Sequence, residues 1–190
     1  MSEKIVQYLN EAHATEAGLV RVLQSQIAMA PRGAYRTALE KHLDETRNHA
    51  ERVRARLREL HEAESAVQFG IGLAETVVAQ AVALGKTPLD LLRGTSAEER
   101  VLKNAKDAAA TEALEIATYT ALETLAHAVG DDETARMAKS IRADEERMLS
   151  RVLSEIPKLT KAVARDARSR VARSASRQRE ASRRRQPAKA

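Results

Sequence analysis

Apolar residues recur three or four positions apart in two stretches near the start of the chain, which is the spacing of an amphipathic helix. The first stretch spans residues 3–29 and stops before Pro31 and Gly33, residue types that end helices. The second spans about residues 33–62. Because the connection between them is short, the two predicted helices should pack as antiparallel neighbours.

Two more long helices are predicted in the second half of the chain. The third covers residues 96–129, opens with the sequence Ser-Ala-Glu-Glu and should be ended by Gly130. The opening sequence is a capping box, in which the serine hydroxyl and a glutamate carboxylate satisfy backbone N–H groups at a helix start. The fourth follows a cap at Asp131 or Asp132, carries a helical period over residues 135–156, and should end at Pro157.

A long connection, residues 63–96, separates the second and third predicted helices. Ala and Val are frequent over 66–84, where a shorter helix packed on the flank of the bundle is expected. Gln68, Glu75 and Gln80 interrupt this stretch, so it should not span a membrane. Four long helices with short, long and short connections predict an all-α fold, a ferritin-like four-helix bundle whose crossover contains a short extra helix.

Basic residues are concentrated at the C-terminal end of the chain. The 190 residues carry a formal net charge of +5, but residues 158–190 hold 12 Lys and Arg against two acidic residues, giving +10 there and −5 elsewhere. Large apolar side chains are rare in this segment, so burial cannot offset the entropy of ordering it. We expect one domain, residues 1–157, followed by a disordered or frayed basic tail.

Several classes of chemistry are excluded or disfavoured by the residues present. Cysteine is absent, which excludes a disulfide framework, a zinc ribbon and a thiol nucleophile. The chain has no Gly-rich phosphate loop, Ser-His-Asp arrangement or dinucleotide fingerprint, which disfavours hydrolytic and nucleotide-dependent chemistry. Residues 1–10 lack the pattern of a secretory signal, so the cytoplasm is the expected location.

Acidic residues stand on the predicted helices at positions where apolar residues are expected. At about 100° per residue, Glu16 and Glu145 each lie at the centre of the apolar face of their helix. Glu112 and Glu115, three residues apart, share the inward face of another. Burying an unpaired carboxylate is costly, so these charges need compensation. Two divalent cations would provide it, and carboxylate with imidazole suits iron or manganese.

The second predicted helix supplies the imidazoles. Glu45 and His49 are i,i+4 partners, although Glu45 lies near the edge of the apolar face and His42 and His49 lie within it. The candidate metal ligands are Glu16, Glu45, His49, Glu112, Glu115 and Glu145. His13, His42 and Tyr119 are expected to contact the ligands rather than the metal. The alternative is a buried network in which Arg or His pairs with the acids, or a relic site that holds no metal.

Four sequence strings resemble the ferritin-like stress proteins of the YciF type. The strings are Glu11–Glu16, His42–Arg52, Glu112–Tyr119 and Asp144–Glu146. The resemblance covers residues 5–62 and 97–156, and it implies a ferritin-like bundle, often dimeric, with a candidate dimetal site. Ferritin-type sites have Glu and His three residues apart on two helices, whereas here Met148 stands three residues after Glu145.

Together these features predict a ferritin-like protein with a carboxylate-rich site for two iron or manganese ions, acting in iron or peroxide handling or in a stress response. An oxidase, ferroxidase-like or peroxidase-like activity would use the reduced ions with dioxygen or peroxide. A homodimer or a higher homo-oligomer is expected. A structural or adaptor bundle with a relic metal site is an alternative.

The basic tail favours another alternative, a nucleic-acid-associated stress protein. Its side chains can neutralise the phosphates of DNA or RNA without reading sequence. A membrane surface is a less suitable partner, because the tail has no hydrophobic anchor. The candidate nucleic-acid-binding residues are Arg165, Arg168, Arg170, Arg173, Arg177, Arg179, Arg183, Arg184 and Arg185.

Overall fold

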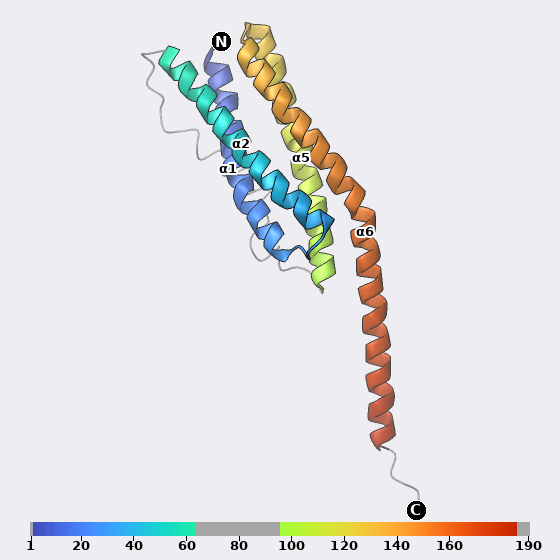
Figure 1. Cartoon of the computed structure of the whole chain (residues 1–190). Helices are drawn as coiled ribbons and strands as arrows, with labels where there is room; N and C mark the ends of the chain where they lie inside the picture. The colour runs from blue at the N-terminus through green and yellow to red at the C-terminus, as the bar shows by residue number, and fades with distance from the viewer. Residues whose placement is uncertain (1, 64–95, 186–190) are drawn as a thin grey trace, which may run out of the picture.

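The computed structural model describes the backbone of residues 2–63 and 96–185, and the side chains of residues 3–61 and 96–180. This part of the chain forms four α-helices, α1 (Ser2–Met29), α2 (Ala34–Ala63), α5 (Ala97–Val129) and α6 (Asp132–Arg185). In Figure 1 the first three helices and the first part of α6 lie side by side as a bundle, and the rest of α6 projects beyond it.

The predicted all-α bundle is therefore confirmed. None of the described helices is long and apolar enough to cross a membrane. The short helix expected over 66–84, and most of the crossover that contains it, lie outside the described residues.

The signals at both ends of α5 act as predicted. The Ser96 side chain accepts a hydrogen bond from the N–H of Glu99 at 3.1 Å, as an N-cap should. Gly130 ends the helix with φ 77°, a left-handed conformation that glycine adopts without a Cβ clash. Asp131 then caps α6, because its Oδ1 accepts from the N–H of Thr134 at 3.0 Å.

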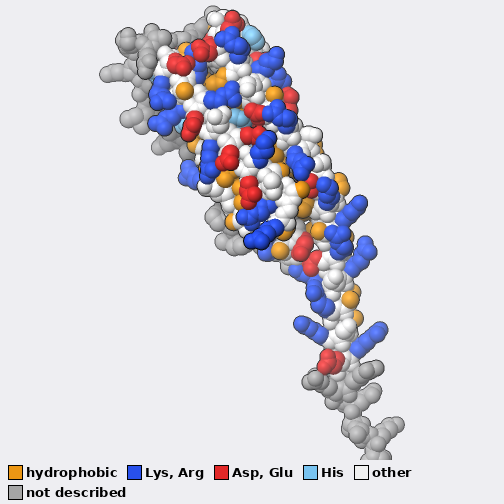
Figure 2. All heavy atoms as spheres, in the orientation of Figure 1, with side chains coloured by type: hydrophobic (Ala, Val, Ile, Leu, Met, Phe, Trp, Pro, Cys, Tyr) orange, Lys and Arg blue, Asp and Glu red, His pale blue; other side chains and the backbone are white. Residues whose placement is uncertain are grey.

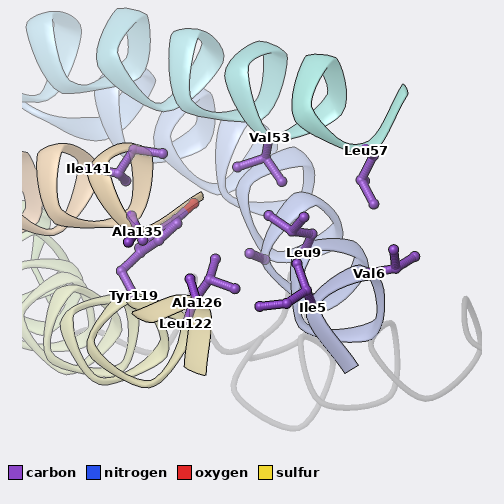
Figure 3. Packing of buried hydrophobic residues seen from close by; sticks show 12 residues of the cluster. Ile5, Val6, Leu9, Val53, Leu57, Tyr119, Leu122, Ala126, Ala135 and Ile141 are labelled. Carbon is purple, nitrogen blue, oxygen red and sulfur yellow. The ribbon is translucent and has the colours of Figure 1, made fainter. Parts of the chain in front are cut away.

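Two apolar cores occupy opposite ends of the bundle. The first joins the starts of α1 and α6 to the ends of α2 and α5, and Figure 3 shows its side chains packed between the helices. Its members are Ile5, Val6, Leu9, Ala12, Val53, Leu57, Tyr119, Leu122, Ala126, Ala135, Ala138 and Ile141. The second core joins the end of α1 and the starts of α2 and α5 to the middle of α6. Its members are Leu23, Ala30, Tyr35, Leu39, Leu43, Val101, Ala105, Ala108, Met148 and Val152.

The prediction that the last helix ends at Pro157 is wrong, because α6 continues through this proline to Arg185. Proline removes one backbone hydrogen bond, here to the carbonyl of Leu153. Leu153 and Pro157 are exposed, so water can reach that carbonyl, while Ile156 and Leu159 on either side of the proline pack against the second core. Apolar contacts therefore hold the helix together across the break.

The tail predicted as disordered or frayed is helical over residues 158–185, and the last five residues lie outside the description. Its side chains behave as their composition suggests, since every residue from 167 to 180 is exposed. The helix therefore extends away from the bundle without a core of its own (Figure 1).

Arg56 joins the end of α2 to the turn between α5 and α6. Its guanidinium donates to Thr134 Oγ1 at 2.9 Å, Asp131 Oδ1 at 2.8 Å and Glu133 Oε2 at 2.9 Å. We expect Arg56→Met to lower the free energy of unfolding by about 1–3 kcal/mol, because it leaves the half-buried Asp131 without its cation. Urea unfolding measures the loss. Arg58→Met, two residues further along α2 at an exposed position, is the control, and equal losses in both variants would contradict this role.

Candidate metal centre

Polar side chains from all four helices fill the layer between the two apolar cores. Six of them have at most 2% of their surface exposed, namely Glu16, His42, His49, Glu112, Glu115 and Glu145. On α1, α5 and α6 these residues stand in the sequence between the members of the first core and the members of the second. On α2 the same holds for His49, whereas His42 directly precedes Leu43 of the second core. They are therefore brought together by the same apolar stripes that build the bundle.

The first group of side chains combines one imidazole with three carboxylates. His42 Nε2 lies 3.3 Å from Glu112 Oε2 and 3.6 Å from Glu145 Oε2. Glu115 completes the group, and one ligand atom from each of the four residues lies within 4.8 Å of the others. Ligand atoms about 2.0–2.2 Å from a divalent ion lie up to about 4.4 Å apart, so this spacing is close to that of a single ion's ligands.

The second group shares a residue with the first. His49 Nδ1 lies 2.9 Å from Glu145 Oε1 and 3.6 Å from Glu16 Oε1, and these three residues also meet the 4.8 Å spacing. Glu145 thus turns one carboxylate oxygen toward His49 and the other toward His42. A carboxylate placed in this way is positioned to bridge two ions.

Many atoms of the centre lack the hydrogen bonds that buried polar atoms normally make. Among the described residues, the unpartnered buried atoms include Glu16 Oε2, Glu112 Oε2, Glu115 Oε1, both oxygens of Glu145 and the Nδ1 atoms of His42 and His49. His49 Nδ1 is 2.9 Å from a Glu145 oxygen, yet the two atoms do not meet hydrogen-bond geometry. Donor atoms that converge without bonding to one another are what a metal site offers to an ion.

Burial and mutual repulsion shift the pKa values of the carboxyl groups upward. Burial raises the pKa of Glu115 well above its ordinary value, and the charges of Glu16 and Glu145 raise it further. Burial also raises the pKa values of Glu16 and Glu145, although the adjacent imidazole of His49 opposes both shifts. Burial lowers the pKa of His49, but Glu145 and Glu16 outweigh it and raise the pKa to about 9.

Charge and chemistry both suit two divalent ions. The four glutamates would carry four negative charges when ionised, which two such ions neutralise. Oxygen ligands with one imidazole per site fit iron or manganese, whereas copper favours more nitrogen or sulfur. By charge and donor type, the residues present fit a carboxylate-bridged pair of ions.

The structure exchanges the positions expected for His42 and Glu45. His42, expected beside the ligands, lies inside the first group. Glu45, expected as a ligand, lies outside both groups with 27% of its side chain exposed. Its carboxylate accepts from Lys41 at 2.9 Å and lies 3.6 Å from His42 Nδ1, so it can orient that imidazole. The placement of His42 within the apolar stripe was the available sequence signal.

Other residues support the groups from outside. The Tyr119 hydroxyl donates to Glu16 Oε1 at 2.5 Å, in the position expected for a residue that holds a ligand. Asp144 Oδ2 lies 3.2 Å from His49 Nε2, a contact that sequence reasoning missed. The helical wheel places Asp144 to one side of the buried face, and only the packing of α2 against α6 brings it to His49. His13 is half-buried, and burial with the nearby Arg54 lowers its pKa.

The candidate nucleic-acid-binding arginines lie on a different part of the molecule. Arg165, Arg168, Arg170, Arg173, Arg177 and Arg179 are exposed on α6, beyond the packed part of the bundle. The side chains of Arg183, Arg184 and Arg185 lie outside the described ones, although their backbone is helical. None of the six arginines with described side chains belongs to either ligand group of the metal centre.

Solved structures show the same fold at low sequence identity. The stress protein YciF of E. coli is 20% identical, with a TM-score of 0.68 over 85% of this chain and 98% of that one. A protein from Xanthomonas campestris is 21% identical, with a TM-score of 0.67 over 88% and 98%. A dodecameric thioferritin from Bacteroides fragilis, a bacterioferritin-related protein, is 21% identical, with a TM-score of 0.60 over 85% and 91%.

The family comparison covers more of the sequence than any motif. No curated protein matches this chain. The model of the family described as "Domain of unknown function (DUF892)" matches residues 1–165, which include all the residues of the metal centre. That match, the fold shared with YciF and the strings on α1, α2, α5 and α6 give one conclusion. The chain belongs to the DUF892 family, and it has the fold of the stress protein YciF.

Proposed function

We propose that the bundle binds two iron or manganese ions in the layer between its apolar cores. The observation that carries this proposal is Glu145, which is buried, faces both groups of ligands and has neither oxygen satisfied by a hydrogen bond. His42, Glu112 and Glu115 would complete one site, and Glu16 and His49 would complete the other.

When bound, such ions supply one-electron redox chemistry and Lewis acidity toward dioxygen or peroxide. The chain supplies the surroundings for that chemistry. The two apolar cores exclude water from both ends of the centre. Tyr119 fixes the carboxylate of Glu16, and Asp144 and Glu45 orient the imidazoles of His49 and His42. Because the centre is small and buried, its substrate should be small, which favours iron or peroxide handling during stress.

Metal analysis tests this proposal. Protein purified without a His tag and loaded anaerobically with Fe²⁺ or Mn²⁺ should hold two ions per chain after gel filtration. The double variant Glu16→Ala with Glu145→Ala should hold none, while Glu146→Ala should hold two, because Glu146 is half-exposed on the outer face of α6. Wild-type protein that binds no ion, and whose stability a chelator leaves unchanged, would instead support a structural bundle with a relic site.

The proposal also covers the location and the assembly of the protein. We propose that the protein acts in the cytoplasm as a homodimer or a larger homo-oligomer. One solved structure with this fold is dodecameric, which supports assembly without fixing the number of subunits. Light scattering coupled to gel filtration gives that number directly.

The exposed helix favours a second proposed function, attachment to nucleic acid. The match to the family model ends at residue 165, so most of the basic segment lies outside it. We propose that residues 1–157 form the metal-binding domain and that 158–190 attach it to the phosphates of DNA or RNA. A metal centre that consumes iron or peroxide would then act close to the molecule it protects.

A further inference from the structure

The part of α6 beyond the bundle is a helix with unusually little burial and much positive charge. All its described side chains from residue 167 onward are exposed, and Figure 2 shows Lys and Arg projecting along it. Residues 167–185 contain eight arginines and one acidic residue. At 1.5 Å per residue this segment is about 28 Å long, which corresponds to about eight base pairs of B-form DNA.

The arginines form two rows on this helix rather than a uniform coat. At about 100° per residue, Arg165, Arg168 and Arg179 lie within about 60° of one another. Arg170 and Arg173, with Arg177, form a second such row about 140° away around the helix. Asp166 lies in the second row, where it pairs with Arg170 at 2.9 Å.

An uncharged strip runs along the wider side between the two rows. Over residues 160–180 its members are small or neutral, namely Thr160, Val163, Ala164, Ala167, Val171, Ser174, Ala175 and Gln178. Glu180 lies on the opposite, narrower side. The helix thus presents an uncharged face of mostly small side chains, with a row of arginines along each edge of that face.

We infer that this helix lies in the major groove of double-stranded DNA, with the uncharged strip toward the groove floor and one arginine row on each phosphate backbone. The inference rests on the second proposed function and specifies its partner. A helix of about 10–12 Å diameter fits the B-form major groove, which is about 12 Å wide. Small side chains allow close approach, and arginine binds phosphate with paired hydrogen bonds.

Other polyanions fit this face less well. The major groove of an RNA duplex is too narrow for a helix, and the segment has no aromatic residue on which single-stranded bases could stack. Amphipathic helices that bind membranes insert large apolar residues such as Leu, Phe or Trp. Residues 167–185 contain only Val171 as a large apolar residue.

Binding of the full chain to a short fluorescent DNA duplex tests the inference. We expect duplex DNA to bind more tightly than a single strand or an RNA duplex of the same sequence. With six arginines on phosphates, the slope of log K against log salt concentration should be about −5. Equal affinity for the three nucleic acids, or tighter binding to phosphatidylserine vesicles, would overturn the groove assignment.

A matched pair of variants separates the groove from simple charge attraction. Ala167→Glu with Ser174→Glu adds two acids to the strip, and Ser169→Glu with Ser176→Glu adds two to the opposite side of the same segment. The control acids have more arginines one turn away, so local neutralisation alone would weaken the control at least as much. Circular dichroism checks that both variants keep the wild-type helix content.

We expect the strip variant to lose at least about tenfold in affinity and the control less than about threefold, because only the strip faces the groove. Equal losses would overturn the groove assignment and leave the proposed attachment to nucleic acid standing. If the wild-type protein bound none of the nucleic acids at low salt, both the groove assignment and the proposed attachment to nucleic acid would be wrong.

Discussion

Protein in which glutamine replaces Glu145 is expected to lose both metal ions at once. Its carboxylate is the only side chain shared by the two ligand groups among the described residues, and an amide can neither bridge two ions nor neutralise their charge. Loss of a residue that merely orients a ligand weakens metal binding about 10–100-fold, so loss of a shared ligand should weaken it more than about 100-fold. Anaerobic calorimetric titration with Mn²⁺ measures both sites.

The neighbouring variants show whether Glu145 is shared. Glu16→Gln should reduce the stoichiometry from two ions to one, because Glu16 belongs only to the group with His49. Glu146→Gln is the matched control, since it makes the same chemical change one residue along on the exposed side of α6. If Glu145→Gln retained one tight ion, Glu145 would serve a single site, and the two groups would not form one bridged centre.

The fold and most of the centre could be predicted because their signals are local. The positions of Glu16, Glu112, Glu115 and Glu145 follow from the 3.6-residue period of their own helices. The caps at Ser96 and Gly130 depend on a few neighbouring residues. No knowledge of another helix is needed to place any of these residues on a buried face or at a helix end.

The remaining features depend on how one helix sits against another. The wheel of α2 places His42 within the apolar face and Glu45 at its edge, but which of the two joins the ligands is fixed only by the rotation of α2 relative to α5 and α6. Asp144 reaches His49 for the same reason. Pro157 is a reliable local stop signal, yet packing of Ile156 and Leu159 on the second core overrides it.

Metal-free protein with Glu115→Gln is expected to be more stable than the metal-free wild type at pH 8, by about 1–3 kcal/mol. Glu115 is 2% exposed, one of its oxygens has no partner, and three other glutamates surround it. A neutral amide removes this repulsion and can donate hydrogen bonds to the adjacent carboxylates. Urea unfolding in the presence of a chelator measures the change, and Glu146→Gln should alter stability by less than about 0.5 kcal/mol.

The pH dependence of this difference identifies its cause. The pKa of Glu115 is raised in the folded state above its ordinary value of 4.5, so its contribution to stability is complete below that pH and is lost as pH rises toward the folded pKa. The variant and the wild type should therefore be nearly equally stable near pH 4.5, and the variant should gain an advantage of at most about 1.4 kcal/mol per pH unit above it. A constant difference at all pH values would contradict ionisation as the cause.

Adding metal should reverse the order of the two proteins. An ion at a concentration 100 times its dissociation constant stabilises a folded protein by about 2.7 kcal/mol, and this stabilisation is lost where a ligand is lost. Wild type saturated with Mn²⁺ at pH 8 should therefore unfold at higher urea than Glu115→Gln in the same buffer. If Glu115 lowers the stability of the metal-free protein and raises that of the metal-loaded protein, its role is to bind the ion. If Glu115→Gln were less stable in both states, the carboxylates would instead form a stabilising buried network with His42 and His49.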